Sequence, residues 1–293
     1  YTLALERYQA TGDLSGERSV RMALGNVFVI IDSYELGKAY YEEVFEQMGE
    51  GTSDRFRGML SMNMGWCEYK LGNFESADAW YATAQSLFEK EKSGFFLLGL
   101  YGNQGALHFD RGRFDAAQVC AQNGLDLSRS LGAEKDAFSF QLLLAKIALQ
   151  TDPQRALDMA QAIESELTFM PEHETKRNFY ELMYRAHKEL GLIAQALNMH
   201  EKFLAYRDSV QMQKDHNLVL RTVYEKEIEH RLLTVEMQGK QERSELRIEQ
   251  LQTVIALVLA FVLVTAVLVF YILHIQKRDR LRRGELLGQI DEL

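Results

Sequence analysis

The chain has 293 residues, a formal net charge of −9, two prolines and two cysteines. This acidic balance excludes a general nucleic-acid-binding protein, which needs a basic face. Two cysteines, Cys67 and Cys120, are too few for a disulfide framework or a cysteine-based metal site, and we interpret them as small buried residues. With so few prolines and long stretches rich in Ala, Leu, Glu, Gln and Lys, the sequence predicts an all-α fold. Because the first residue is Tyr1 rather than Met, we expect a further segment upstream.

A repeat of 40 residues organises most of the chain. The segment NMGWCEYKLGNFESADAWYATAQSLF (63–88) aligns without gaps with NQGALHFDRGRFDAAQVCAQNGLDLS (103–128). The matched pairs are Gly65 and Gly105, Gly72 and Gly112, Phe74 and Phe114, and Ala77 and Ala117. An earlier copy and two later ones follow the same pattern, the fourth with a turn one residue shorter. The five copies lie near residues 20–47, 58–90, 98–130, 138–165 and 177–206.

Each copy predicts a hairpin of two helices. Gly65 is small enough to let the two helices approach closely, and Gly72 ends the first helix where a positive φ is needed. Ala77 lies where the second helix crosses the first. One hairpin cannot bury its apolar face alone, so the copies are expected to stack into a superhelix with a concave groove.

The spacing resembles the tetratricopeptide repeat, in the longer-helix form found in bacterial regulators and sensors. The resemblance covers roughly residues 15–206, within a predicted binding domain of residues 1–206. It implies an array of about five hairpins that binds a peptide, a protein or a small ligand in its groove. It implies no enzyme chemistry, and we identify no catalytic, cofactor-binding or metal-binding residue in the sequence.

Position in the repeat selects candidate groove residues on the first helix of each hairpin. Aromatic rings stack on ligands, and amides pair with backbone or hydroxyl groups. The candidates are Asn63, Trp66, Tyr69, Asn103, Phe109 and Arg185. The alternative is that Trp66, Tyr69 and Phe109 only pack between hairpins. The lysine and asparagine clamp of some tetratricopeptide domains is not matched, because the corresponding positions hold residues such as Met62 and Gly102.

A charged, proline-free segment, residues 207–252, follows the array. As one helix it would extend about 70 Å. We favour a stalk that pairs with a second copy in a parallel homodimer, although the heptad pattern breaks around Gly239. The alternative is a solvated helix that caps the last repeat. His216 and His230 share a face of this helix, where protonation would affect a dimer contact unless both are simply solvated. The earlier segment PEHE (171–174) reads as a linker between repeats four and five.

Residues 253–275 form an apolar stretch in which His274 is the only residue that can carry a charge. About 20 apolar residues match the hydrocarbon core of a bilayer, so the sequence predicts one transmembrane helix. Five basic residues follow within residues 276–290, and three precede within 236–250. This bias places the C-terminal end in the cytoplasm and residues 1–252 outside it, at a bacterial inner membrane.

The order of repeats, charged helix and single span resembles the membrane-anchored tetratricopeptide sensors of bacteria. In that family the repeats sense outside the cytoplasm, and the output is a diguanylate cyclase, a histidine kinase or a helix-turn-helix regulator. The tail, residues 276–293, resembles the start of a signalling helix. Its last three residues, Asp291 to Leu293, fit the opening of a diguanylate cyclase (GGDEF) domain, so we favour that output. A histidine kinase, or a membrane-tethered scaffold with no output, remains open.

Overall fold

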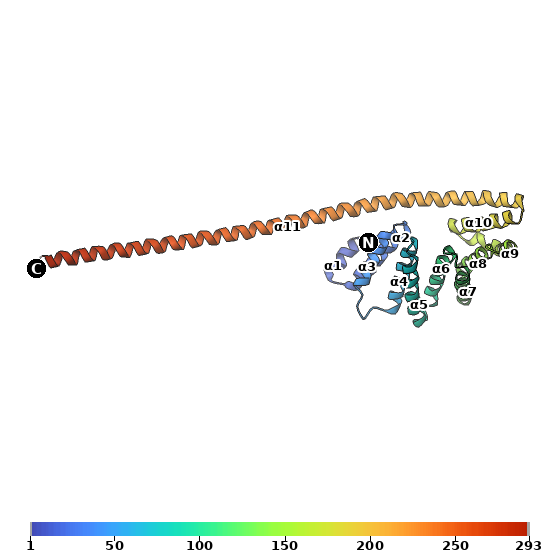
Figure 1. The fold of residues 1–293 in the computed structure, drawn as a ribbon, viewed down its shortest axis with the longest axis horizontal. Helices are drawn as coiled ribbons and strands as arrows, with labels where there is room; N and C mark the ends of the chain where they lie inside the picture. Colours follow the sequence, from blue (N-terminus) through green and yellow to red (C-terminus); the bar gives the residue numbers. More distant parts are fainter. Residues whose placement is uncertain (1, 292–293) are drawn as a thin grey trace. The chain divides into compact units, whose positions relative to one another are not determined.

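The structure is a computed structural model that describes residues 2–291. These residues form α-helices and one short 3-10 helix, and no strand (Figure 1). The helices are α1 (Thr2–Thr11), α2 (Leu14–Ile30), α3 (Tyr34–Glu46), α4 (Asp54–Lys70), α5 (Phe74–Lys90), α6 (Gly94–Asp110), α7 (Phe114–Leu131), α8 (Glu134–Ala148), α9 (Pro153–Ile163), η1 (Glu164–Phe169), α10 (His173–Glu189) and α11 (Ile193–Asp291). The chain divides into two compact units, one up to Val223 and one from Tyr224 onward.

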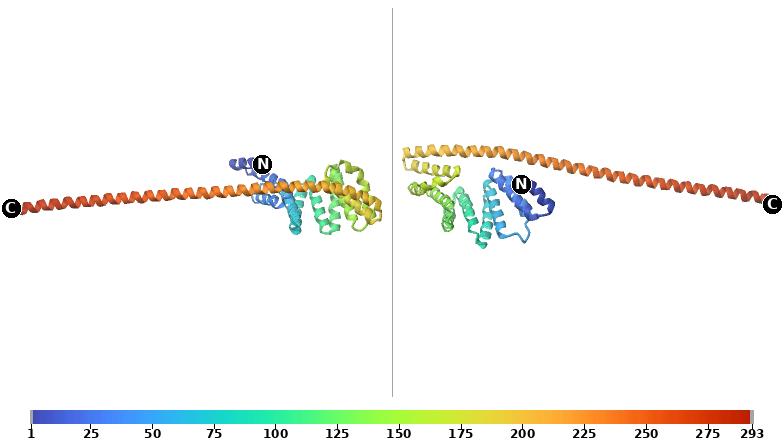
Figure 2. Two further views of the ribbon diagram at one scale, coloured as in Figure 1. Left: turned by 90° about the horizontal axis from the view of Figure 1, so that it is seen from above. Right: turned by 180° about the vertical axis from the view of Figure 1, so that it is seen from behind.

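Five antiparallel hairpins make up the first unit, and this confirms the predicted all-α repeat fold. The pairs are α2 with α3, α4 with α5, α6 with α7, α8 with α9, and α10 with the beginning of α11, and they follow one another in sequence order (Figure 2). Each first helix begins four to six residues before the predicted start of its repeat. The first turns of α8 and α10 are polar, so apolar periodicity does not reveal them. At the start of α4 the Ser53 side chain accepts a hydrogen bond from the Phe56 amide at 3.3 Å and caps the helix.

Helix α1 precedes the five hairpins and was not predicted as a separate element. Its Tyr8 ring lies over Gly16 of α2, where an added Cβ would come within 2.4 Å of the ring. Asp13 caps α2 by accepting hydrogen bonds from the amides of Ser15 at 3.1 Å and Gly16 at 3.0 Å. Helix α1 therefore packs against the first hairpin through Tyr8, and Asp13 caps the helix that follows.

The glycines of the repeat have the roles that the sequence predicts. Gly72, Gly112 and Gly191 take φ values of 83°, 69° and 74° at the turn between the two helices of their hairpins. At Gly65 an added Cβ would lie 2.6 Å from the buried ring of Tyr81, so only glycine lets α4 and α5 approach this closely. The hairpin cores are built from such side chains, and Tyr81 is fully buried.

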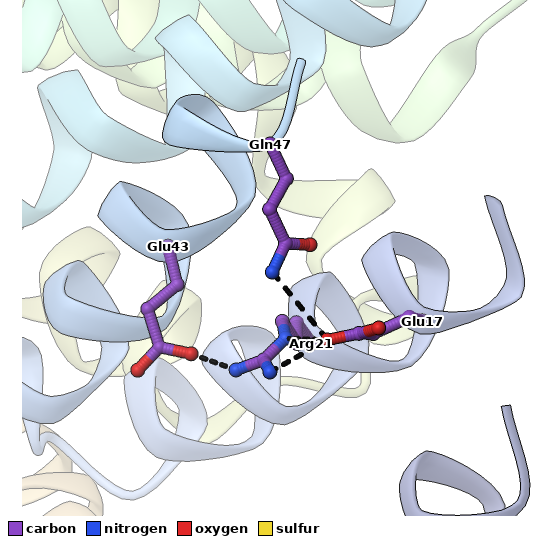
Figure 3. Close-up of polar contacts among 4 residues, drawn as sticks. All are labelled: Glu17, Arg21, Glu43 and Gln47. Carbon is purple, nitrogen blue, oxygen red and sulfur yellow. Dashed lines mark hydrogen bonds and ion pairs between the residues drawn. The ribbon is translucent and has the colours of Figure 1, made fainter. Parts of the chain in front are cut away.

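A polar cluster joins α2 to α3 in the first hairpin (Figure 3). Arg21 lies between two carboxylates: it pairs with Glu17 one turn earlier at 2.7 Å and with Glu43 across the hairpin. Gln47 adds a hydrogen bond from its Nε2 to Glu17 at 3.4 Å. The Glu17 side chain is only 10% exposed. Because a buried carboxylate is costly without a partner, Arg21 holds this hairpin together.

Helix α11 begins as the second helix of the fifth hairpin and continues without a break. Tyr206 stacks on Tyr180 of α10, with ring centroids 5.5 Å apart. The segment PEHE, predicted as a linker, is divided: His173 and Glu174 belong to the first turn of α10, and the His173 ring lies 5.9 Å from that of Tyr206.

In the second unit, the segment Arg243–Ile272 of α11 is long and apolar enough to cross a membrane. Its described side chains are exposed, apart from the partly buried Thr265. The predicted limits of the stalk (207–252) and the span (253–275) both fall within α11. The predicted match to a cyclase opening involves Glu292 and Leu293, which lie outside the described residues.

Candidate binding groove

The groove is lined by one stripe of side chains on each of the first helices α6, α8 and α10. Along α8 the stripe contains Ser139, Leu142 and Lys146, spaced three and four residues apart. This spacing puts them on one face of the helix. The matching stripes are Gly99, Gly102 and Ala106 on α6, and Asn178, Glu181 and Arg185 on α10. The 40-residue repeat therefore brings side chains of three different hairpins to one surface.

Two adjoining cavities lie along these stripes. The larger, of about 280 Å³, lies between α6, α8 and the start of α10, and the smaller, of about 190 Å³, lies beside Phe109 and the end of α10. Lys146 and Asn178 line both cavities. Together the two hollows suit an extended ligand with several side chains rather than one compact small molecule.

Small residues on α6 create the larger cavity. A Cβ added at Gly102 would meet no atom within 4 Å, and one added at Gly99 would meet only the Met62 sulfur at 3.7 Å. Helix packing therefore does not require these two glycines, in contrast to Gly65. A glycine inside a helix costs about 1 kcal/mol relative to alanine. The open space is thus maintained at a cost to the stability of α6.

Lys146 is the charged group at the centre of the groove. Its ammonium is half-buried, and in the described part of the chain no carboxylate lies within the 4.0 Å of an ion pair. Burial lowers the pKa of Lys146, and the more distant Glu181 offsets this only in part. An anionic group placed in either cavity would relieve this cost by supplying a counter-charge.

Asn178 presents its amide beside Lys146. Arg177 donates a hydrogen bond to the Asn178 Oδ1 at 2.8 Å, which leaves the Nδ2 hydrogens to serve as donors. Arg177 in turn pairs with Glu174 at 3.2 Å. This chain of contacts orients Asn178 before any ligand arrives. A carboxylate near Lys146 would therefore find a charged donor and a neutral donor together.

Of the six candidates chosen from the sequence, Phe109 and Arg185 line the smaller cavity. Asn103 is half-buried on α6 and belongs to neither cavity lining. Asn63 donates to Asn26 of α2 at 3.0 Å, and Tyr41 donates to the same Asn26 oxygen at 2.6 Å. Asn63 thus joins the first two repeats.

Trp66 and Tyr69 lie together at the end of α4. Their ring centroids are 5.4 Å apart, and the Lys70 ammonium lies 4.8 Å from the centroid of Trp66. The Tyr69 hydroxyl donates a hydrogen bond to Asp110 of α6. Burial, together with this contact to a carboxylate, raises the pKa of Tyr69. Tyr69 therefore makes a contact between hairpins, whereas the ring contacts described for Trp66 lie within α4.

The candidates chosen from the sequence did not include Lys146 or Asn178, although the repeat spacing indicates that Lys146 is at a groove position. Lys146 lies 80 residues after Trp66, at the same position of its repeat, and Arg185 occupies that position in the fifth repeat. A single lysine within the apolar run LLLAKIAL (142–149) is unusual for a buried helix face. The sequence candidates were mainly aromatic and amide residues, with Arg185 as the one charged residue, and Lys146 was not among them.

Neither cysteine lies in the groove lining. Cys67 is buried, and burial raises the pKa of its thiol to about 12, so it is a structural residue of the second repeat. Cys120 is partly buried, and burial likewise raises the pKa of its thiol.

No protein-family model matches the sequence, and no curated protein matches it. Three solved structures resemble it in fold. The first is the Rap conjugation gene regulator of the plasmid pLS20 in complex with the Phr peptide, at 16% identity and a TM-score of 0.59 over 74% of this chain. The second is BtubC (BKLC) from P. vanneervenii, at 12% identity and a TM-score of 0.54, covering 72% of this chain and 89% of that one.

The third is a Podospora anserina kinesin light chain protein with nearly identical TPR-like repeats, at 12% identity and a TM-score of 0.52, covering 66% of this chain and 96% of that one. The chain spans 61% of the length of the Rap regulator. At these identities the likeness concerns the fold alone. The hairpins up to Val223 form a tetratricopeptide-like repeat array.

Proposed function

We propose that the array binds an acidic, extended peptide segment in the groove formed by α6, α8 and α10. The observation that carries this proposal is the half-buried Lys146 ammonium, which lines both cavities without a carboxylate in ion-pair range among the described residues. The peptide bound by the structurally similar Rap regulator supports a peptide as the class of ligand.

The residues of the groove have separate roles in binding the peptide. Lys146 pairs with an acidic side chain or a terminal carboxylate of the peptide, and the Asn178 amide donates to the same group. Gly99 and Gly102 leave room for the peptide backbone or a neighbouring side chain to approach α6. The ring of Phe109, in the smaller cavity, contacts an apolar side chain further along the peptide.

A peptide selection tests this proposal without a known ligand. The full chain in detergent is panned against a displayed library of random peptides, in parallel with the Lys146→Met variant and, as a matched control, Lys214→Ala on an exposed part of α11. We expect the peptides selected by the native chain and by Lys214→Ala to be enriched in Asp and Glu. The peptides selected by Lys146→Met should show no such enrichment. Equal enrichment in all three selections, or none, would contradict an acidic ligand at Lys146.

We further propose that the apolar part of α11 anchors this array in a membrane, with the array outside the cytoplasm. The stretch Arg243–Ile272 and the excess of Lys and Arg after it support this orientation. Reporter enzymes fused before residue 243 and after residue 276 test it. We expect a reporter that works only in the cytoplasm to be active after the span and silent before it; the reverse pattern would overturn the proposed direction.

Within this proposal the chain is a sensor whose ligand alters the array and, through α11, a cytoplasmic output. A diguanylate cyclase is the favoured output, with a histidine kinase as the alternative, on the resemblance of the repeat, helix and span order alone. A membrane-tethered scaffold would need only the array and the anchor. The coding sequence after Leu293 distinguishes these three: a GGDEF loop, a kinase histidine box, or neither.

A further inference from the structure

A second set of contacts joins the two ends of the array. On α11, Asn217 donates from Nδ2 to the Ile30 carbonyl at 3.1 Å and to an Asp32 carboxylate oxygen at 3.4 Å. Arg221 donates to the Asp32 carbonyl at 3.3 Å and pairs with Glu35 at 3.5 Å. Ile30, Asp32 and Glu35 surround the turn between α2 and α3, in the first repeat. Helix α11 starts in the fifth repeat, so one straight segment connects the first hairpin to the last.

The connecting segment contacts the repeats at its two ends, and the residues between these contacts are exposed. At one end Tyr206 stacks on Tyr180 of α10, and Val210 is buried. Residues 211–216 are all exposed, and half-buried positions resume at Asn217. At 1.5 Å per residue, Tyr206 and Arg221 are about 22 Å apart along the helix. Residues 207–223 therefore form a rigid strut between the repeats.

The strut contacts the first repeat at the turn between α2 and α3, and this turn differs from the corresponding turns of other repeats. Repeats two, three and five have Gly72, Gly112 and Gly191 there, whereas the first repeat has Asp32 with φ 60°. A side chain in this left-handed region is strained, and asparagine and aspartate tolerate it best. Lys92 adopts a similar φ of 52° at another turn, so the strain itself does not indicate a role. What distinguishes Asp32 is that its carboxylate accepts from both Tyr34, at 2.6 Å, and Asn217.

The contacts at this turn are weaker than the packing within the hairpins. The described contacts are polar and lie at a partly exposed site, where pairing between charged groups is screened by solvent and salt. The hairpins, in contrast, are held by fully buried rings such as Tyr41 and Tyr81. A force that changes the curvature of the array will therefore separate the strut from the turn before it disrupts a hairpin.

We infer that the strut and the Asp32 turn form a releasable latch. When the latch is closed, it fixes the separation of the first and fifth repeats and so the curvature of the array. When it opens, the array flexes and α11 is free of the first repeat. No residue among the described side chains of α11 lines the two groove cavities, so the latch controls the array without covering the groove. This inference does not depend on what the groove binds.

Hydrogen exchange of the full chain in detergent, followed by mass spectrometry, tests the latch. The variant Asn217→Ala/Arg221→Ala removes the α11 side chains. We expect protection to fall about tenfold, equivalent to about 1.4 kcal/mol, both in residues 211–223 and in residues 28–36 of the first repeat. The loss of protection at residues 28–36 is the decisive result. A purely local effect on α11 would not reach a turn that lies 187 residues away in the chain.

Two further variants complete the experiment. Asp32→Gly keeps the turn, since glycine occupies it in three other repeats, but removes the carboxylate; we expect faster exchange in 211–223 with α2 and α3 still protected. Lys214→Ala, on the exposed part of the strut, should leave both regions unchanged. Unchanged exchange at residues 28–36 in the double variant would overturn the latch. So would a loss of protection that extends through α4 to α9, because the variant would then act through general unfolding.

Discussion

The Tyr69 hydroxyl donates a hydrogen bond to the carboxylate of Asp110, joining the C-terminal ends of α4 and α6. The two residues are 41 positions apart and belong to successive repeats. Tyr69 also packs against Phe74, with ring centroids 6.3 Å apart. One tyrosine thus connects two hairpins through its ring and its hydroxyl.

Tyr69→Phe removes only the hydroxyl. We expect it to lower the free energy of unfolding by about 1 kcal/mol, the usual net worth of one hydrogen bond. Urea unfolding measures this conveniently, because both tryptophans, Trp66 and Trp80, lie in the second repeat and report on it by fluorescence. If the variant instead keeps full stability and loses peptide binding, Tyr69 is a groove residue and its contact with Asp110 is incidental.

Arg21→Met leaves the buried Glu17 carboxylate without its main partner. Breaking a buried pair from one side costs about 3–5 kcal/mol, so we expect a large loss of stability in the first hairpin. Arg207→Met is the matched control: Arg207 pairs with Asp208, and both side chains are more than half exposed. Exposed pairs contribute about 0–1 kcal/mol. Thermal unfolding that affects both variants equally would show that Arg21 does not stabilise a buried charge.

The free energy of unfolding of the second repeat should fall at acidic pH, because Glu68 becomes protonated there. Burial alone would raise the pKa of Glu68, but hydrogen bonds from Asn73 at 2.7 Å and Lys38 at 2.9 Å outweigh it and hold the pKa below 4.5. The unfolded chain therefore takes up a proton before the folded chain does as the pH falls. The resulting stability is complete above about pH 4.5 and is lost as the pH drops through the folded-state pKa.

The variant Glu68→Gln isolates this contribution. Urea midpoints measured from pH 7 to pH 3 should fall less steeply for the variant than for the native chain. The same contact raises the pKa of Lys38 above 10.5, so its contribution is present below that value and disappears as the pH rises through the folded-state pKa. Identical acid dependence in the two proteins would show that Glu68 is not stabilised in its charged form.

Two helix glycines, Gly102 and Gly65, should respond oppositely to alanine. Gly102→Ala adds a methyl group where no atom lies within 4 Å, so we expect it to stabilise α6 by up to about 1 kcal/mol. Gly65→Ala places the methyl 2.6 Å from the Tyr81 ring and should destabilise the second hairpin. Gly102→Leu should fill the larger cavity and weaken peptide binding. A Gly102→Ala variant as damaged as Gly65→Ala would mean that α6 packs more tightly there than the groove geometry indicates.

The repeat fold was predictable because its signal is local and recurs. Gly65, Gly72 and their partners 40 residues later mark one hairpin geometry, and any two copies reveal it. Helix α1 was missed because it stands outside the repeat, so no second copy in the chain reveals its contact between Tyr8 and Gly16. The first turns of α8 and α10 are polar, so the apolar pattern predicts later starts for these helices than the structure has.

The groove was only partly predictable. Its wall positions follow from the repeat, and Arg185 was found in this way. The chemistry at each position differs between repeats, so the repeat pattern alone did not single out Lys146. The contact of Asn217 with Asp32 could not be predicted at all, because it depends on the pitch that five stacked hairpins accumulate. No local pattern encodes a contact between residues 185 positions apart.

The most direct test of the central claim is the affinity of the full chain for two peptides that differ only in charge. An acidic peptide taken from the selection and its amide counterpart, with Gln for Glu and Asn for Asp, are titrated calorimetrically into the native chain, Lys146→Met and Lys214→Ala. A charge-assisted hydrogen bond is worth about 1.5–3 kcal/mol, so the native chain and Lys214→Ala should bind the acidic peptide at least about tenfold more tightly. Lys146→Met should bind both peptides alike. If Lys146→Met retains the full preference for the acidic peptide, Lys146 does not recognise the ligand and the proposed groove is wrong.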